Sequence, residues 1–358
     1  MFAVTMFAQC RLPEVAPGAI ARMSAFELVE AGHFHEAVTR LEPIVKTQPG
    51  NGEAAWLFSR AKSYLGDLDE ALKLAEGALV TEEANSAYHV QVAAVAGRMA
   101  QKASLLKQLG LARRVKKELD ETVRLNPKNS DGQYGLMMFY YAAPSLLGGD
   151  KNKSKSIGEE LAKTVPDLGL YYQARLAHEM KEFDKEEAFY KQSILVNPLL
   201  YDAYLGLAEL YLSADKRAPA KAAMWACQAI RTDPTRGQAW SALARVLALD
   251  GCWTEATQAA GLAEAINPRD LAPYYAIATA ALERGDQTET AIEYLRKYIA
   301  QPAEGNEPSV AMGHWKLGLA VDKQGDRAAG IAEIQAALKM DSTLDGAKAD
   351  LKRLQAKQ

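Results

Sequence analysis

The sequence has few cysteines, few aromatic residues, little net charge and no long apolar run. Three cysteines in 358 residues are too few for a disulfide framework. Aromatic residues make up only 8% of the chain, and the formal net charge of −3 gives no global field toward nucleic acid or anionic lipid. No apolar run approaches the ~18 residues of a membrane span. We therefore expect a chain held together by its hydrophobic core.

Sequence motifs for catalysis or metal binding are also missing. His178 and Glu179 begin a pattern like the HExxH of zinc proteases, but Glu182 stands where the second histidine is needed. The glycines and lysines of residues 148–154 lack the spacing of a phosphate-binding loop. No serine, cysteine or threonine lies in the context of an activated nucleophile. We therefore expect no enzymatic activity, no metal and no cofactor.

The N-terminal segment, residues 1–17, begins with an apolar run that no lysine or arginine precedes. This run is short for a signal peptide. Two interpretations remain open: it is the remnant of a longer signal peptide with a misplaced start codon, or it is a disordered or packed N-terminus. The first would make the protein periplasmic and the second cytoplasmic.

An internal repeat organises the rest of the chain. Residues 237–270 align without gaps on residues 271–304, so that Trp240 matches Tyr274 and Gly251 matches Gly285. The period is about 34 residues, and each repeat places large apolar and small residues at helical spacing on two successive faces. A glycine between the faces permits a tight turn, and a proline at the end stops the second helix. The pattern predicts two antiparallel helices per repeat.

This pattern resembles the tetratricopeptide repeat (TPR). The resemblance implies an all-α fold, a right-handed α-α superhelix of about nine helix-turn-helix units with a C-terminal capping helix. We expect the repeat array to span residues 18–342 and the capping helix residues 343–358. One repeat departs from the pattern at Glu186, where a small residue is expected.

Two irregularities interrupt the repeats. One unit, about residues 85–127, is too long, and we expect its first helix to extend from Asn85 to Leu109. An insertion at residues 144–151 follows, and the combination resembles a group of bacterial TPR proteins with an "AP-x-LLGG" loop and no established activity. We expect the lysines of this loop, and the basic cluster of residues 113–117 with Lys102 and Lys107, to be solvated. A contact with an anion, a partner or nucleic acid is the weaker alternative for these cations.

The resemblance to TPR proteins also implies a binding surface. In such proteins the first helices line a concave groove, and aromatic and arginine side chains there are typical of binding hot spots. Arginine recurs at one groove position in three repeats, which favours a carboxylate ligand. We therefore expect a protein-protein interaction scaffold that binds a protein or peptide partner and no nucleic acid; the alternative is a small-molecule-binding TPR protein of the cell envelope. The predicted groove residues are Trp56, Arg60, Tyr64, Phe139, Tyr171, Arg175, His178, Asp202, Glu209, Gln238, Arg245, Tyr275 and Trp315.

Overall fold

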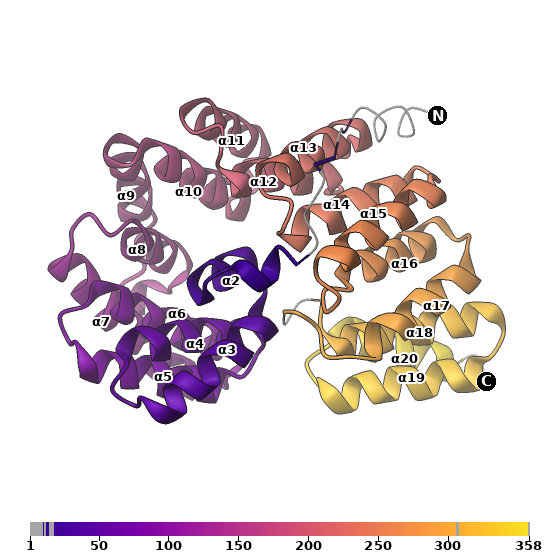
Figure 1. Ribbon diagram of the computed structural model, residues 1–358, viewed down its shortest axis with the longest axis horizontal. Helices are drawn as coiled ribbons and strands as arrows, with labels where there is room; N and C mark the ends of the chain where they lie inside the picture. Colours follow the sequence, from indigo (N-terminus) through magenta and orange to yellow (C-terminus); the bar gives the residue numbers. More distant parts are fainter. Residues whose placement is uncertain (1–9, 11, 14–17, 306–307, 357–358) are drawn as a thin grey trace. The chain divides into compact units, whose positions relative to one another are not determined.

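The computed structural model describes residues 10, 12–13, 18–305 and 308–356, so most of the predicted N-terminal segment 1–17 lies outside the described residues. Within these ranges the chain forms helices and no strand. Two compact units can be distinguished (Figure 1). Unit 1 holds the described residues up to Met23, residues 31–33 and the chain from Tyr204 onward, and unit 2 holds residues 24–30 and 34–203.

Unit 2 is built from successive helical hairpins. Neighbouring helices pack against each other from α3 to α11, and the first helix of one hairpin also contacts the first helix of the next, as α4 contacts α6 and α6 contacts α8. The helices are α2 (Ala25–Ala31, whose last residue falls in unit 1), α3 (Phe34–Thr47), α4 (Gly52–Tyr64), α5 (Leu68–Thr81), α6 (Ser86–Lys102), α7 (Leu105–Leu125), α8 (Ser130–Ala142), α9 (Lys151–Thr164), α10 (Pro166–Glu179) and α11 (Phe183–Val196).

Unit 1 repeats the same arrangement. The first helices α14, α16 and α18 contact one another in succession, and α20 packs on α19, where its Ala347 and Leu354 are buried against Ile334. Pairing the helices from α2 to α19 gives nine hairpins in the described chain, followed by α20 alone, so the predicted TPR-like all-α array is confirmed. The helices of this part are η1 (Ile20–Arg22), α12 (Tyr201–Leu212, which begins in unit 2), α13 (Pro219–Thr232), α14 (Gly237–Leu249), α15 (Trp253–Ile266), α16 (Ala272–Arg284), α17 (Thr288–Ile299), α18 (Val310–Gln324), α19 (Arg327–Met340) and α20 (Asp345–Gln355).

The turn inside most hairpins requires a left-handed backbone. Gly66, Gly251 and Gly325 occupy this position with φ values of 88°, 81° and 110°. Only glycine adopts this conformation without a steric penalty from Cβ. In the α10–α11 hairpin the same place is taken by Lys181, with φ 58°. The glycines therefore mark the turns, as the repeat pattern predicts. The α10–α11 hairpin has a lysine at this position, although the conformation is unfavourable for a residue with a Cβ.

Small side chains line the seam between the two helices in several hairpins. In unit 2 Ala37 and Ala71 are fully buried there, as are Ala222 and Ala256 in unit 1. Hairpin α10–α11 differs, because Glu186 is buried at the corresponding place. The predicted departure from the repeat is therefore a buried carboxylate, and its partner is described below.

The third hairpin corrects one prediction. Helix α6 ends at Lys102, and the backbone becomes extended at Ala103 and Ser104 before α7 begins at Leu105. The expected single helix from Asn85 to Leu109 is therefore wrong. The additional residues are shared between α6, with 17 residues, and α7, with 21.

The insertion after α8 forms a short turn rather than an open loop. It contains η2 (Ser145–Leu147), followed by Gly148 with φ 91°. Gly149 is needed for a different reason, since a Cβ there would lie 1.8 Å from the carbonyl oxygen of Ala143. The Asp150 carboxylate then accepts hydrogen bonds from two backbone N–H groups of the first turn of α9.

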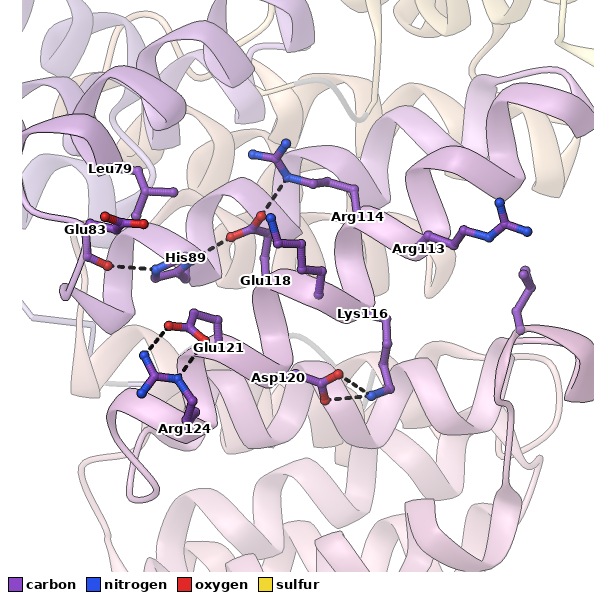
Figure 2. A pocket seen from close by; sticks show the side chains of 12 residues that line it. Leu79, Glu83, His89, Arg113, Arg114, Lys116, Glu118, Asp120, Glu121 and Arg124 are labelled. Atoms are coloured by element: carbon purple, nitrogen blue, oxygen red, sulfur yellow. Dashed lines mark hydrogen bonds and ion pairs between the residues drawn. The ribbon is translucent and has the colours of Figure 1, made fainter.

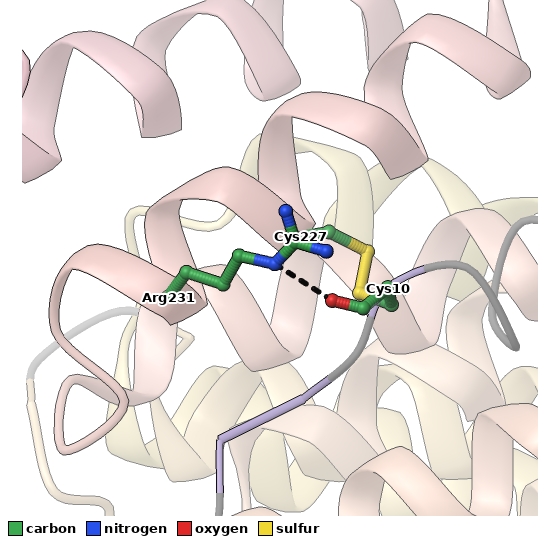
Figure 3. Close-up of a disulfide and its surroundings, with 3 residues drawn as sticks. All are labelled: Cys10, Cys227 and Arg231. Atoms are coloured by element: carbon green, nitrogen blue, oxygen red, sulfur yellow. Dashed lines mark hydrogen bonds between the residues drawn. A yellow bond between two sulfur atoms is a disulfide. The ribbon is translucent and has the colours of Figure 1, made fainter.

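A disulfide joins Cys10 to Cys227 on α13, across 217 residues of sequence (Figure 3). The two Cα atoms are 5.4 Å apart, and the Arg231 guanidinium donates a hydrogen bond to the Cys10 carbonyl oxygen. Cys252 is a buried free thiol. Cysteine count alone excluded a disulfide framework, but it did not reveal this single covalent tether.

Candidate functional site

The predicted groove residues of α4 form one cluster in unit 2. The Arg60 guanidinium lies 5.2 Å from the centroid of the Trp56 ring and forms an ion pair with Glu30. Tyr64 stacks on Phe34 with 4.5 Å between ring centroids. The charge of Arg60 is thus already matched inside the protein, so this cluster has little capacity for a further anion.

Further along unit 2, Arg175 of α10 lies half-buried among tyrosines. Burial opposes its charge, but the oxygens of Tyr190, Tyr171 and Tyr134 more than compensate and raise its pKa. Predicted residues Tyr171 and Arg175 therefore lie together. Phe139, also predicted for the groove, is instead buried in the core with neighbouring helices, which leaves little of its ring for a partner.

His178 is the partner of Glu186, the buried carboxylate of the α10–α11 hairpin. Its Nδ1 lies 3.0 Å from Oε2 of Glu186. Burial raises the pKa of the Glu186 carboxyl, and His178 and Arg175 oppose this rise. The imidazole is half exposed, so the predicted groove residue His178 connects the surface with a carboxylate inside the helix seam.

Three further predicted groove residues lie on α12 and α14. Asp202 is half-buried on α12, and Glu209 and Gln238 are exposed on α12 and α14.

A cleft of about 430 Å³ lies in unit 1, between the first helices of three successive hairpins. Helix α14 contributes Arg245, α16 contributes Tyr275 and α18 contributes Lys316. Two of these were predicted from the sequence, and the repeat brings them together because each occupies the same helical face of its hairpin. The remaining lining residues are Thr279, Leu282, Glu283 and Leu319.

The polar wall of this cleft is already organised. Arg245 donates hydrogen bonds to Oγ1 of Thr279 at 3.0 Å and to Oε2 of Glu283 at 2.7 Å. The other oxygen of Glu283 accepts a hydrogen bond from Arg217 at 2.9 Å. One carboxylate thus lies between two guanidinium groups, which leaves a net positive charge. Burial raises the pKa of Tyr275 to about 12, so its hydroxyl remains a hydrogen-bond donor.

Lys316 is the unmatched cation of the cleft. Its Nζ lies 3.7 Å from the centroid of the Trp315 ring, and no carboxylate of the described chain forms an ion pair with it. Burial lowers the pKa of Lys316, Arg245 lowers it further, and Asp350 acts in the opposite direction. Asp350 itself accepts a hydrogen bond from Nε1 of Trp315 at 3.0 Å. Predicted residue Trp315 therefore positions the lysine rather than lining the cleft itself.

Sequence reasoning missed the residues that give this cleft its charge pattern. Thr279 is separated from Arg245 by 34 residues, so the repeat period alone could have paired them. Lys316 had no such signal, because it follows Trp315 at a position that the repeat does not assign to the groove. Arg217 lies in the loop between α12 and α13, outside the periodic pattern.

A second polar pocket, of about 640 Å³, lies in unit 2 along α6 and α7 (Figure 2). His89 and Glu118 are buried in its wall, with 2.6 Å between Nδ1 and Oε2. Arg114 pairs with the other oxygen of Glu118 at 2.7 Å, and Lys116 pairs with Asp120. Figure 2 shows that Arg113 points away from this cluster.

The His89 imidazole has no nitrogen left for a substrate. Its Nε2 lies 2.9 Å from the carbonyl oxygen of Glu83, while Nδ1 faces Glu118. Both ring nitrogens therefore already have a hydrogen-bonding neighbour within the protein. We interpret this pair as a structural cross-link between α6 and α7 rather than as acid-base machinery.

The described residues contain no group of three or more histidine, cysteine, aspartate or glutamate side chains arranged to hold a metal ion. None of the described helices combines the length and the apolar character of a membrane span.

Comparisons with known proteins identify no family for this chain. No protein-family model matches the sequence, and no curated protein matches it. Among solved structures, a chain of the APC/C hetero-tetramer Cut9-Hcn1 matches with 15% identity and a TM-score of 0.48, over 92% of this chain and 76% of that one. The MamA protein matches with 20% identity and a TM-score of 0.36, over 49% of this chain and 92% of that one. These values carry no information on a partner, so the function is inferred from the residues of the cleft.

Proposed function

We propose that the protein is a non-enzymatic interaction scaffold that binds an acidic segment of a partner protein in the cleft between α14, α16 and α18. The observation that supports this proposal is Lys316, a half-buried cation without a carboxylate partner in the described chain. A buried charge is costly unless it is paired, so a ligand carboxylate would compensate the cost. The 144–151 loop resembles that of bacterial TPR proteins with no established activity, so this resemblance does not add an activity to the proposal.

Side chains around Lys316 suit such a ligand. Arg245 and Tyr275 direct donors into the same cleft, and Leu282 and Leu319 provide apolar walls. A volume of about 430 Å³ accommodates a side chain or a chain end rather than a folded domain. Acidic side chains flanked by apolar ones are therefore the expected contact of the partner.

The proposal is tested with the full-length protein as bait in its native cell extract, and with a fluorescent glutamate-rich peptide as a defined probe. The variants are Lys316→Gln and Arg245→Gln, and the matched control is Lys339→Gln, which removes an exposed lysine from α19. A charge-assisted hydrogen bond contributes about 1.5–3 kcal/mol, so each cleft variant should weaken peptide binding by about tenfold or more. The control should bind like the wild type.

Three outcomes separate the interpretations. Loss of the same captured protein in both cleft variants, with the control unchanged, supports the proposal. If both cleft variants capture the same protein as the wild type does, the cleft is refuted as the binding site. A thermal shift with small carboxylates, in the absence of any captured protein, would indicate that the cleft binds a small molecule instead.

A further inference from the structure

The connection between α6 and α7 presents leucines to solvent. Leu105 and Leu106, in the first turn of α7, are 80% and 84% exposed, and Leu109 on the next turn is also exposed. Leu109 follows Leu105 by four positions and Leu106 by three, and these spacings bring side chains together on one side of a helix, so the three leucines form one apolar surface. We call this surface, together with the flanking Lys102 and Lys107, the leucine tip.

The charge around the leucine tip is of one sign. Between Glu83 and Glu118 the sequence has no Asp or Glu, although the chain has 45 acidic residues and a net charge of −3. The same stretch contains the cations Arg98, Lys102, Lys107, Arg113, Arg114, Lys116 and Lys117.

Some of these cations are neutralised within unit 2, and others are not. Arg114 and Lys116 pair with carboxylates farther along α7. Lys102, Lys107 and Arg113 are exposed and have no carboxylate partner in the described chain. Of these unneutralised cations, Lys102 ends α6 and Lys107 lies in the first turn of α7, so the two lysines flank Leu105 and Leu106 in the sequence.

The η2 turn adds a further leucine next to this basic region. Helix η2 contacts α7, and its Leu147 lines the same pocket as Arg113 and Lys117. The adjacent Leu146 is 92% exposed. Two irregularities of the repeat array, the lengthened third hairpin and the LLGG insertion, therefore both expose leucines next to cations.

We propose that the leucine tip docks the protein on an anionic lipid surface. Leu105, Leu106 and Leu109 line neither the cleft of unit 1 nor the polar pocket of unit 2, so a protein partner would need a complementary pocket for them, whereas the lipid interface accepts apolar side chains without a shaped site. The surrounding cations complement lipid headgroups of negative charge. Binding of this kind is peripheral and is independent of the carboxylate cleft in unit 1.

The test is co-sedimentation of the full-length protein with phosphatidylcholine vesicles that contain about one third phosphatidylglycerol. Leu105→Gln with Leu106→Gln should lower the partition coefficient by at least about tenfold, because the apolar insertion is lost. Lys102→Gln with Lys107→Gln should lower it by about fivefold per charge at low salt. Because all four side chains are exposed, the variants should keep the wild-type circular dichroism and melting curve.

A matched control comes from the same unit. Leu195 and Leu199 are 82% and 78% exposed at the end of α11 and have no comparable basic stretch around them. Leu195→Gln with Leu199→Gln should leave vesicle binding unchanged, and pure phosphatidylcholine vesicles should bind the wild type weakly.

Two results would overturn the proposal. One is a wild type that does not sediment with anionic vesicles; if it instead binds soluble poly-glutamate or DNA through the same lysines, an acidic macromolecule is the occupant. The other is vesicle binding that the leucine-tip variants and the control variant lower equally. Retention of cleft-dependent peptide binding in the leucine-tip variants distinguishes this proposal from the scaffold function above.

Discussion

A close contact between two helices in unit 1 gives the sharpest prediction of stability. Gly318 on α18 faces Gly330 on α19. A Cβ added to Gly318 would lie 2.6 Å from the carbonyl oxygen of Gly330 and 2.6 Å from Cγ1 of Ile334. The first contact is with backbone, so Gly318→Ala can be accommodated only if the two helices move apart.

Two opposing contributions set the magnitude. Replacing a mid-helix glycine by alanine stabilises a helix by about 0.5–1 kcal/mol. Overpacking a close helix contact costs typically about 1–3 kcal/mol and sometimes more. We therefore predict that Gly318→Ala lowers the free energy of unfolding by about 1–2 kcal/mol.

Gly261 provides the control for helix propensity. It lies within α15, and a Cβ there would meet no atom within 4 Å. Gly261→Ala should therefore raise the free energy of unfolding by about 0.5–1 kcal/mol. The two alanine variants should differ by about 1.5–3 kcal/mol although the chemical change is identical.

Urea unfolding followed by far-ultraviolet circular dichroism measures both variants. The helical repeats unfold in partly independent segments, so the midpoint of the transition that contains α18 and α19 is the relevant quantity. If Gly318→Ala unfolds at the same or a higher urea concentration than the wild type, the close glycine contact is refuted. If Gly261→Ala is destabilised, the propensity reasoning fails instead.

Three further predictions concern unit 2 and the tether. Lys181→Gly should stabilise the protein by about 1 kcal/mol in urea unfolding, because a non-glycine residue is strained at φ 58°; a destabilised variant would contradict this. Burial raises the folded-state pKa of Glu186, so the cost of its charge is present above that pKa and is relieved as the pH falls through it. Wild type should thus gain stability relative to Glu186→Gln as the pH is lowered toward the ordinary glutamate pKa of about 4.3, and a relative loss would reverse the assigned sign. Reduction of the Cys10–Cys227 disulfide should lower the free energy of unfolding by about 2–5 kcal/mol, whereas Cys227→Ser should not respond to the reductant; equal responses would refute the tether.

The repeat pattern predicted the hairpins because each repeat uses the same few contacts. Alanine at the seam, such as Ala71 and Ala256, and glycine at the turn, such as Gly66 and Gly251, act locally, so their spacing in the sequence is their spacing in the structure. The end of α6 at Lys102 was not predicted, because nothing in the local sequence distinguishes an extended Ala103 from a helical one.

The candidate site was only partly predictable, because the repeat period gives the position of a residue in its hairpin but not its contacts with other hairpins. Arg245 and Tyr275 could be assigned to the groove from their position in the repeat, and both line the cleft. The pairing of Arg245 with Glu283, and the lack of a pair for Lys316, depend on which side chains meet across hairpins. Single-sequence periodicity does not contain this information. The partner of Cys10 was hidden likewise, since three cysteines allow more than one pairing.

The separation of Cys10 from Cys227 has a consequence during biosynthesis. Because 217 residues lie between them, the first cysteine leaves the ribosome about 10–40 s before the second, at ordinary elongation rates. During this interval Cys10 is a thiol without its native partner. Disulfides persist in oxidising compartments, so a nascent chain made there must keep this thiol from other cysteines until α13 has been synthesised. Closure of the bond then encloses the whole of the chain from α2 to α12 in one covalent ring.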